Sequence, residues 1–170
     1  PEEDIQTIEE KIEDGFRTFM LKMGTLSIDH EIKRIKAVTK RFGAEISLLV
    51  DANQGWDVSQ TLQFISSLQG YRIALMEQPI TRWDFSGLKR IRAHSPWPVS
   101  ADESLISIHD AMILIREEAV DVFSIKVSKN GGITPAKKIA VLAEAFGMKC
   151  LMNSMLEFGI TQAASLHVGC

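Results

Sequence analysis

The sequence predicts an α/β fold with a parallel β-sheet, and three observations support this class. Short runs rich in β-branched and aromatic residues alternate along the chain with longer amphipathic stretches of helical period. No Gly/Ser-rich linker or low-complexity segment interrupts the alternation, so we expect one continuous region. A helix between two strands returns the chain to the sheet in the same direction, which makes the strands parallel.

We expect six strands, because six short apolar runs are rich in strand formers. They cover residues 17–23, 46–51, 73–77, 98–102, 121–127 and 148–153. Ser107, with Asp110 three residues later, predicts a helix start, and Thr134 before Pro135 predicts another with proline in the first helical position. Helix ends are expected at Gly43, Gly70 and Gly147. Two architectures remain, an open doubly wound sheet and part of a (β/α)8 barrel.

The composition excludes several classes of function. With 45% hydrophobic residues and a net charge of −3, the 170-residue chain can bury the core of one globular domain. Basic residues are scattered among acidic ones, so we expect no binding of nucleic acid. No apolar stretch approaches the length of a membrane span, and the first residues do not resemble a signal peptide. Cys150 and Cys170 lie far apart without metal-type spacing, so we expect a soluble protein of the reducing cytoplasm.

Five ionisable residues close successive predicted strands. They recur every 24 to 29 residues and are Lys22, Asp51, Glu77, Asp102 and Lys126. In parallel α/β folds the carboxyl ends of the strands share one rim, so the fold brings these five groups together. A site at this rim explains why the apolar run "LLVDANQGW" ends on an acid.

The three carboxylates of this group predict a metal site. A single acid at a strand end is usually a turn former or a helix cap, but three on adjoining strands repel one another unless a cation lies between them. Oxygen ligands without nearby histidine or cysteine favour Mg²⁺ over Zn²⁺, with Mn²⁺ as an alternative. A lone lysine at a strand end is normally a solvated charge, whereas two that flank a metal site suit acid/base chemistry.

The segments "DANQGW", "MEQP", "SADES" and "IKVSKNGGIT", in this order and spacing, resemble the barrel domain of the enolase superfamily. The likeness is to the muconate lactonizing enzyme subgroup of the mandelate racemase/muconate lactonizing enzyme family, and it covers almost the whole chain. It implies a TIM-barrel-like (β/α) barrel in which Asp51, Glu77 and Asp102 bind Mg²⁺. It also implies that Lys126 and Lys22 act as acid and base on opposite sides of the substrate.

The resemblance implies that residues 1–170 are a partial barrel domain, covering roughly strands two to seven. The N-terminal capping domain and the last strand are then expected to be absent. The chain starts at Pro1 and stops inside the apolar stretch "AASLHVGC", which also predicts a fragment. We expect the full-length protein to be a homo-oligomer.

The sequence departs from the family at one position, and several residues near the site have two interpretations. The family usually has Lys-x-Lys on its second strand, and here Met20 replaces the first lysine, where it could form a pocket wall. Asn53 and Glu103 match positions near the metal, but each could instead cap a turn. In "MNSMLEFGI", which resembles the seventh-strand segment, Asn153 and Glu157 are candidates for substrate contact. Glu157 could equally stabilise the start of the following helix.

The resemblance implies Mg²⁺-dependent removal of a proton next to the carboxylate of a small-molecule substrate, through an enediolate. A racemase, an epimerase or a cycloisomerase would use this step, and a dehydratase of the same superfamily is an alternative. The residues also fit a non-catalytic Mg²⁺-binding module on a doubly wound sheet, or a barrel that has lost its activity.

Overall fold

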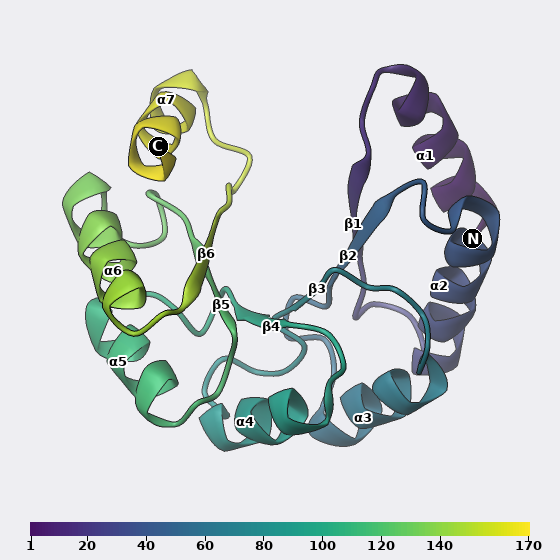
Figure 1. Ribbon diagram of the computed structural model, residues 1–170, viewed down its shortest axis with the longest axis horizontal. Helices are drawn as coiled ribbons and strands as arrows, with labels where there is room; N and C mark the ends of the chain where they lie inside the picture. The colour runs from purple at the N-terminus through teal and green to yellow at the C-terminus, as the bar shows by residue number, and fades with distance from the viewer.

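The computed structural model describes all 170 residues and contains a single six-stranded sheet with helices around it. Figure 1 shows the strands as an open arc, with the helices on the outer side only. All neighbouring strands are parallel. The strands are β1 (Thr18–Lys22), β2 (Ser47–Asp51), β3 (Leu75–Glu77), β4 (Val99–Ala101), β5 (Val122–Ile125) and β6 (Lys149–Met152). All six predicted strands are therefore confirmed, with ends that differ by at most two residues.

Seven helices precede, separate and follow the strands. They are α1 (Glu2–Glu13), α2 (Ile28–Phe42), α3 (Val58–Ser67), α4 (Phe85–His94), α5 (Ile108–Arg116), α6 (Ile133–Ala145) and α7 (Gly159–Gly169). The predicted start of α5 is confirmed, because the Ser107 and Asp110 side chains form a reciprocal capping box. Helix α6 starts at Ile133, two residues before Pro135, so the prediction that proline occupies the first helical position was wrong. The first-turn N–H groups have no partner within the helix, and proline is tolerated there as well.

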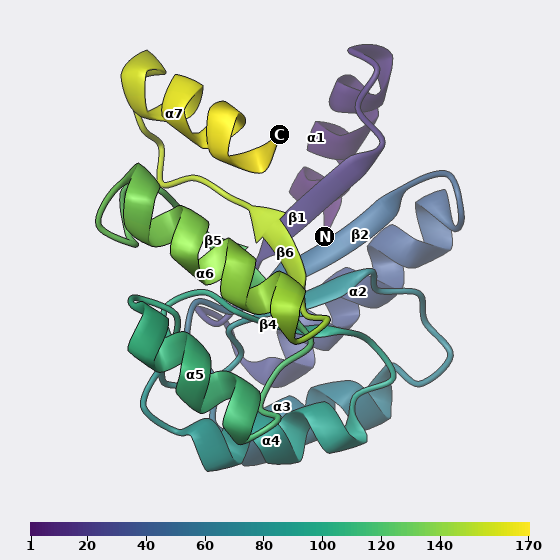
Figure 2. The ribbon, with the colours of Figure 1, turned by 60° about the vertical axis from the view of Figure 1, so that its left-hand side comes forward.

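The strand order decides between the two predicted architectures. It runs from β1 to β6 without a reversal, and the helices cover one face. A doubly wound sheet reverses its order at a switch point and has helices on both faces. The structure is therefore a half-barrel, in which β1 and β6 form the two edges of the arc (Figure 2). No helix has both the length and the apolar character that crossing a membrane requires.

The hydrophobic core lies between the convex face of the sheet and the helices. Strand residues that alternate with the polar rim residues are fully buried there, for example Val50 beside Asp51 and Met76 beside Glu77. They pack in one cluster with helix side chains that include Ile35, Phe64, Leu88, Leu114 and Ile139. Side chains alternate between the two faces of a strand. Val50 and Met76 point to the helices on the convex face, so their acidic neighbours point to the concave face.

Two glycines let the loops after β1 and β2 touch backbone to backbone. A Cβ atom on Gly55 would lie 2.5 Å from the Cα of Gly24, and one on Gly24 would lie 2.3 Å from the carbonyl oxygen of Ala52. Gly24 also has a φ of +86°, which disfavours other residues. The loops that follow Lys22 and Asp51 are therefore fixed to each other.

We predict that Gly55→Ala destabilises the protein by about 2 kcal/mol, because the added methyl group overpacks a backbone contact. Gly159→Ala is the matched control, since its Cβ would meet open space and its φ is not positive. The measurement is urea unfolding of the full-length protein. Equal midpoints for the two variants would show that the two loops can move apart at little cost.

Candidate active site

The five ionisable residues predicted at the strand ends lie along one rim of the half-barrel. Lys22, Asp51 and Glu77 are the last residues of β1, β2 and β3, and Asp102 and Lys126 come directly after β4 and β5. In the register, Lys22 lies opposite Asp51, Asp51 opposite Glu77, and Glu77 opposite Ser100, two residues before Asp102. Steps of two keep side chains on the same face, so this group faces the concave side.

The three carboxylates of the rim are buried, and each has a polar partner. The exposed fractions of Asp51, Glu77 and Asp102 are 0%, 0% and 2%. The ammonium group of Lys22 pairs with Oδ2 of Asp51, and that of Lys126 pairs with Oδ2 of Asp102. Glu77 instead accepts hydrogen bonds from two neutral partners. Ser100 Oγ lies 3.3 Å from Oε2, and Asn153 Nδ2 lies 3.1 Å from Oε1 and also donates to Ser124 Oγ at 3.0 Å.

A third lysine, Lys129, which the sequence did not single out, also binds the rim. Its Nζ lies 2.8 Å from Asp102 Oδ1, 2.7 Å from the Asp102 carbonyl oxygen and 2.8 Å from the Ser124 carbonyl oxygen. Burial lowers the pKa of Lys129 from its usual value, although the charge of Asp102 opposes that shift. In the sequence, Lys129 resembles an ordinary surface lysine. Its position just before a Gly-Gly turn is the only signal that could have indicated a role in the site.

The carboxylates shift the pKa values of their neighbours. Burial, and then the charges of Asp51 and Asp102, raise the pKa of Glu77 to about 7. For Lys22 burial acts to lower the pKa, but the hydrogen bond and charge of Asp51 outweigh it and raise the pKa above its usual value. Burial and the two neighbouring aspartates therefore disfavour the ionised form of Glu77.

The donor set fits a hard divalent cation, although the side chains do not form a closed cage. No group of three or more carboxylate, histidine or cysteine side chains is close enough together to hold an ion. Two of the three carboxylates are instead turned to lysines. Three buried carboxylates on adjoining strands, one with a raised pKa, are nonetheless the oxygen ligands that Mg²⁺ takes.

The backbone after two of the acidic strand ends has an unusual conformation. Asn53, Gln54 and Gln78 have φ values of +44°, +68° and +32°, which residues other than glycine rarely adopt. Gln78 is fully buried, and its Oε1 accepts hydrogen bonds from the backbone N–H groups of Asp102 and Ser104 at 3.0 and 3.1 Å. Such conformations cost free energy and persist only where surrounding contacts hold them, commonly at functional sites.

The predicted supporting residues Asn53 and Glu103 contact each other across the rim. The backbone N–H of Asn53 donates to Asp51 Oδ1 at 2.9 Å, and its side-chain amide donates to Glu103 Oε1 at 3.2 Å. The second oxygen of Glu103, Oε2, is buried without a hydrogen-bond partner. Asp51 thus caps the turn through the Asn53 N–H, and the Asn53 side chain joins this turn to the loop that carries Glu103.

Comparison with known proteins identifies the fold. The family model described as enolase C-terminal domain-like matches residues 3–170. The chain belongs to this family. An L-Ala-D/L-Glu epimerase from Clostridium acetobutylicum is 36% identical over 99% of this chain and 47% of the relative. The named relatives are isomerases of the enolase superfamily, as the resemblance implied.

Two solved structures are similar over almost the whole chain. Muconate cycloisomerase from Pseudomonas fluorescens has a TM-score of 0.93 and 38% identity, and the match covers 98% of this chain and 46% of that one. A dipeptide epimerase from Enterococcus faecalis, complexed with Mg and the dipeptide L-Leu-L-Tyr, has a TM-score of 0.92 and 38% identity, over 96% and 46%. This enolase-type chain therefore spans about half the length of its relatives.

The remaining predicted residues of this enolase-type barrel lie near the rim but outside the carboxylate group. Met20 is half-buried, two residues before Lys22, and so points to the same concave face. Glu157 lies in the loop before α7, where its carboxylate accepts hydrogen bonds from Ser128 Oγ at 2.7 Å and the Met155 N–H at 2.6 Å. The Ser128 hydrogen bond lowers the pKa of Glu157. Glu157 is thus fixed beside the segment that carries Lys126.

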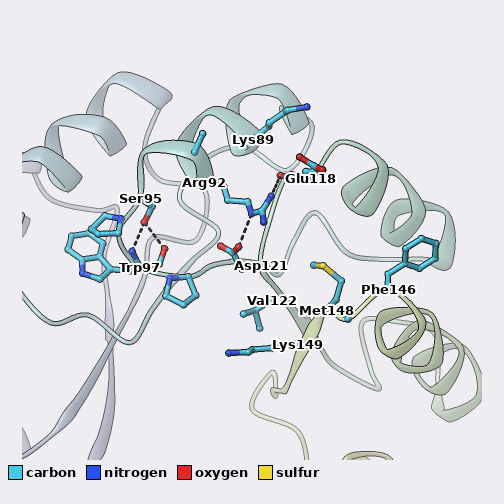
Figure 3. A pocket seen from close by; sticks show the side chains of 14 residues that line it. Lys89, Arg92, Ser95, Trp97, Glu118, Asp121, Val122, Phe146, Met148 and Lys149 are labelled. Atoms are coloured by element: carbon cyan, nitrogen blue, oxygen red, sulfur yellow. Dashed lines mark hydrogen bonds and ion pairs between the residues drawn. The ribbon is translucent and has the colours of Figure 1, made fainter.

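A cavity of about 800 Å³ lies at the opposite end of the strands (Figure 3). It is lined by residues such as Pro98, Val122 and Lys149, which precede or begin β4, β5 and β6. Its Arg92 is already paired with Asp121 at 2.7 Å. Enzymes with (β/α) barrels place their chemistry at the carboxyl ends of the strands, so we assign the site to the rim.

We predict that the metal-free protein loses stability as the pH rises from about 4.5 to 7, in part because of Glu77. The unfolded chain releases the Glu77 proton near pH 4.5, and the folded chain releases it only near pH 7. The raised pKa therefore stabilises the folded state fully below pH 4.5, and this stabilisation is lost as the pH rises to 7. This difference in the pKa of Glu77 corresponds to roughly 3 kcal/mol in the free energy of unfolding. In EDTA, Glu77→Gln should remove this slope from the pH dependence of urea unfolding.

Glu144→Gln, an exposed position on α6, is the control and should keep the slope. If Glu77→Gln unfolds with the same pH dependence as the unsubstituted protein, the pKa of Glu77 is the same in the folded and unfolded states and the prediction is wrong.

Proposed function

We propose that the protein is an isomerase that removes the proton next to the carboxylate of a small-molecule substrate. One observation carries this proposal: Lys22 and Lys126 flank the three strands that bear the buried carboxylates. Two bases separated in this way can approach a bound substrate from opposite sides. The named relatives, which are epimerases, racemases and cycloisomerases, support the same class of reaction.

In this proposal Asp51, Glu77 and Asp102 hold Mg²⁺, with Mn²⁺ as a substitute. The support is their burial, the raised pKa of Glu77 and the Mg in the similar dipeptide epimerase. When bound, Mg²⁺ supplies positive charge that binds the substrate carboxylate and lowers the energy of the enediolate. The residues of the chain keep the three carboxylates on one rim and bring two ammonium groups beside them.

The two lysines would share the proton transfers unequally. Lys126 shares its carboxylate partner Asp102 with a second lysine, Lys129, whereas Lys22 pairs with Asp51 alone. To accept a proton, each must first leave its carboxylate and become neutral. Lys22 has no lysine at position 20 to lower its pKa, so its release depends on other positive charge near Asp51.

Epimerisation or racemisation is the reaction that this two-base arrangement suits best, and a dipeptide is one substrate class that the relatives suggest. If only one lysine moves a proton, cycloisomerisation or dehydration is the alternative, and muconate cycloisomerase supports the first of these. We further propose that the chain corresponds to strands two to seven of the complete barrel. Met20, Asn53, Glu103, Asn153 and Glu157 would then support the metal or line the substrate pocket.

We predict that Lys126→Ala and Lys22→Ala each abolish epimerisation in the full-length protein with Mg²⁺ present. In heavy water, each variant should still exchange the α-proton of one stereoisomer, and the two should spare opposite ones, because each keeps one base. The measurement is NMR-detected exchange with L-Ala-L-Glu, L-Ala-D-Glu and L-Leu-L-Tyr as probes. Lys138→Ala, an exposed lysine on α6, is the control and should keep full activity.

If one variant loses all exchange while the other keeps turnover, a one-base cycloisomerase or dehydratase is favoured. If both variants retain the turnover and exchange of the unsubstituted protein, the lysines are surface charges and the proposal fails.

A further inference from the structure

Lys129 is one of two nearly buried lysines of the rim, and all of its hydrogen bonds go to oxygens of the rim strands. Its side chain is 8% exposed, and Nζ donates to three oxygens within 2.8 Å. An ammonium group has three N–H donors, so these three acceptors use all of them. The acceptors come from two strand ends, Asp102 after β4 and Ser124 in β5. Lys129 therefore joins the two strands and has no donor left for a substrate.

Lys129 and Lys126 hold the two oxygens of the same carboxylate. Lys126 Nζ pairs with Asp102 Oδ2, and Lys129 Nζ lies 2.8 Å from Oδ1. The Asp102 backbone is fixed separately, since its N–H donates to Gln78 Oε1 at 3.0 Å and its carbonyl oxygen accepts from Lys129. If Lys126 leaves to carry a proton, Lys129 is the partner that still sets the direction of this carboxylate.

The turn that follows Lys126 makes Lys129 a rigid element. Asn130 bonds both backbone groups of Lys126: its N–H donates to the Lys126 carbonyl, and its Oδ1 accepts from the Lys126 N–H, each at 2.9 Å. Its side-chain amide also donates to the carbonyls of Leu105 and Ile106, in the segment after Asp102. Asn130 is itself 4% exposed. The backbone that carries both lysines is thus fixed to the loop that carries Asp102.

We propose that Lys129 is a positioning residue that holds the Asp102 carboxylate in its ligand orientation, so that Lys126 is free to exchange protons with the substrate. This inference rests on the proposed function, because it assumes that Asp102 binds the metal. It assigns different tasks to two lysines of the segment "IKVSKNGG": Lys126 acts on the substrate, and Lys129 acts only through Asp102.

A positioning role and a purely electrostatic role change metal affinity in opposite directions. Removing a positive charge beside three carboxylates makes the rim more negative, which by itself strengthens the binding of a divalent cation. Removing the hydrogen bonds that orient Asp102 weakens binding, because residues that orient a metal ligand commonly contribute 10- to 100-fold to affinity. The sign of the change therefore distinguishes the two roles.

Lys129→Met and Lys129→Gln form a matched pair for the test. Both side chains are neutral and nearly equal in length, but only glutamine can donate hydrogen bonds to the freed oxygens. We expect the Mg²⁺ dissociation constant of the full-length protein, measured by titration calorimetry, to rise tenfold or more for Lys129→Met. For Lys129→Gln we expect a rise of about threefold. Lys138→Met, which removes the same charge from the exposed surface of α6, should leave the constant unchanged within twofold.

Unchanged or tighter Mg²⁺ binding by a folded Lys129→Met variant would overturn the proposal, as would equal weakening by methionine and glutamine. If the methionine variant does not fold, Lys129→Gln decides, and unchanged or tighter binding by it would overturn the proposal. If the unsubstituted protein binds no Mg²⁺, the proposed function itself fails. If it binds Mg²⁺ and only the variants depart from the expected order, the proposed function stands and the role of Lys129 is wrong.

Discussion

Burial of three carboxylates at the ends of adjoining strands is the constraint on which the rest of this rim depends. Alternation along the strands places apolar residues in the core, so Asp51, Glu77 and Asp102 must face the concave side. There they repel one another in surroundings that exclude water, and the pKa of Glu77 rises to about 7. Three lysines and an asparagine are the partners of these carboxylates, and we propose that a divalent cation binds the same oxygens.

The three lysines differ in how many oxygens hold them, and the division of tasks that we propose follows from this difference. Lys22 pairs with one oxygen of Asp51, Lys126 pairs with one oxygen of Asp102, and Lys129 is held by three oxygens. The loops that follow β1, β2 and β4 are held by close contacts. Gly24 and Gly55 pack backbone on backbone, and buried Gln78 ties the end of β3 to the loop after β4. A fixed frame with two releasable ammonium groups is what proton transfer on both faces of a substrate needs.

Most of the fold could be predicted from the sequence because its signals are local and repeated. Apolar strands, each closed by a charged residue, recur at nearly constant spacing, and the capping box at Ser107 has a direct physical cause. The strand order could not be read from these patterns, since both architectures alternate strands and helices. Pro135 was assigned to the wrong position for a similar reason, because every position of the first turn tolerates proline.

Site residues at the ends of strands could be predicted from the sequence. Site residues whose side chains reach the rim from a loop could not. Parallel strands bring their carboxyl ends together whatever the loops do, so Asp51, Glu77 and Asp102 could be grouped. Lys129 reaches the rim only because Asn130 fixes the turn, and Gln78 only because its backbone adopts a positive φ. Contacts of this kind depend on tertiary structure, and no spacing in the sequence encodes them.

A crystal structure of the full-length protein with Mn²⁺, located by its anomalous scattering, tests the central claim most directly. The account predicts one strong peak among the carboxylates of Asp51, Glu77 and Asp102, with Lys126 Nζ withdrawn from Asp102 and Lys129 Nζ still bound to it. A saturating Mn²⁺ concentration that gave no peak at this rim, with both aspartates still paired to Lys22 and Lys126, would contradict it.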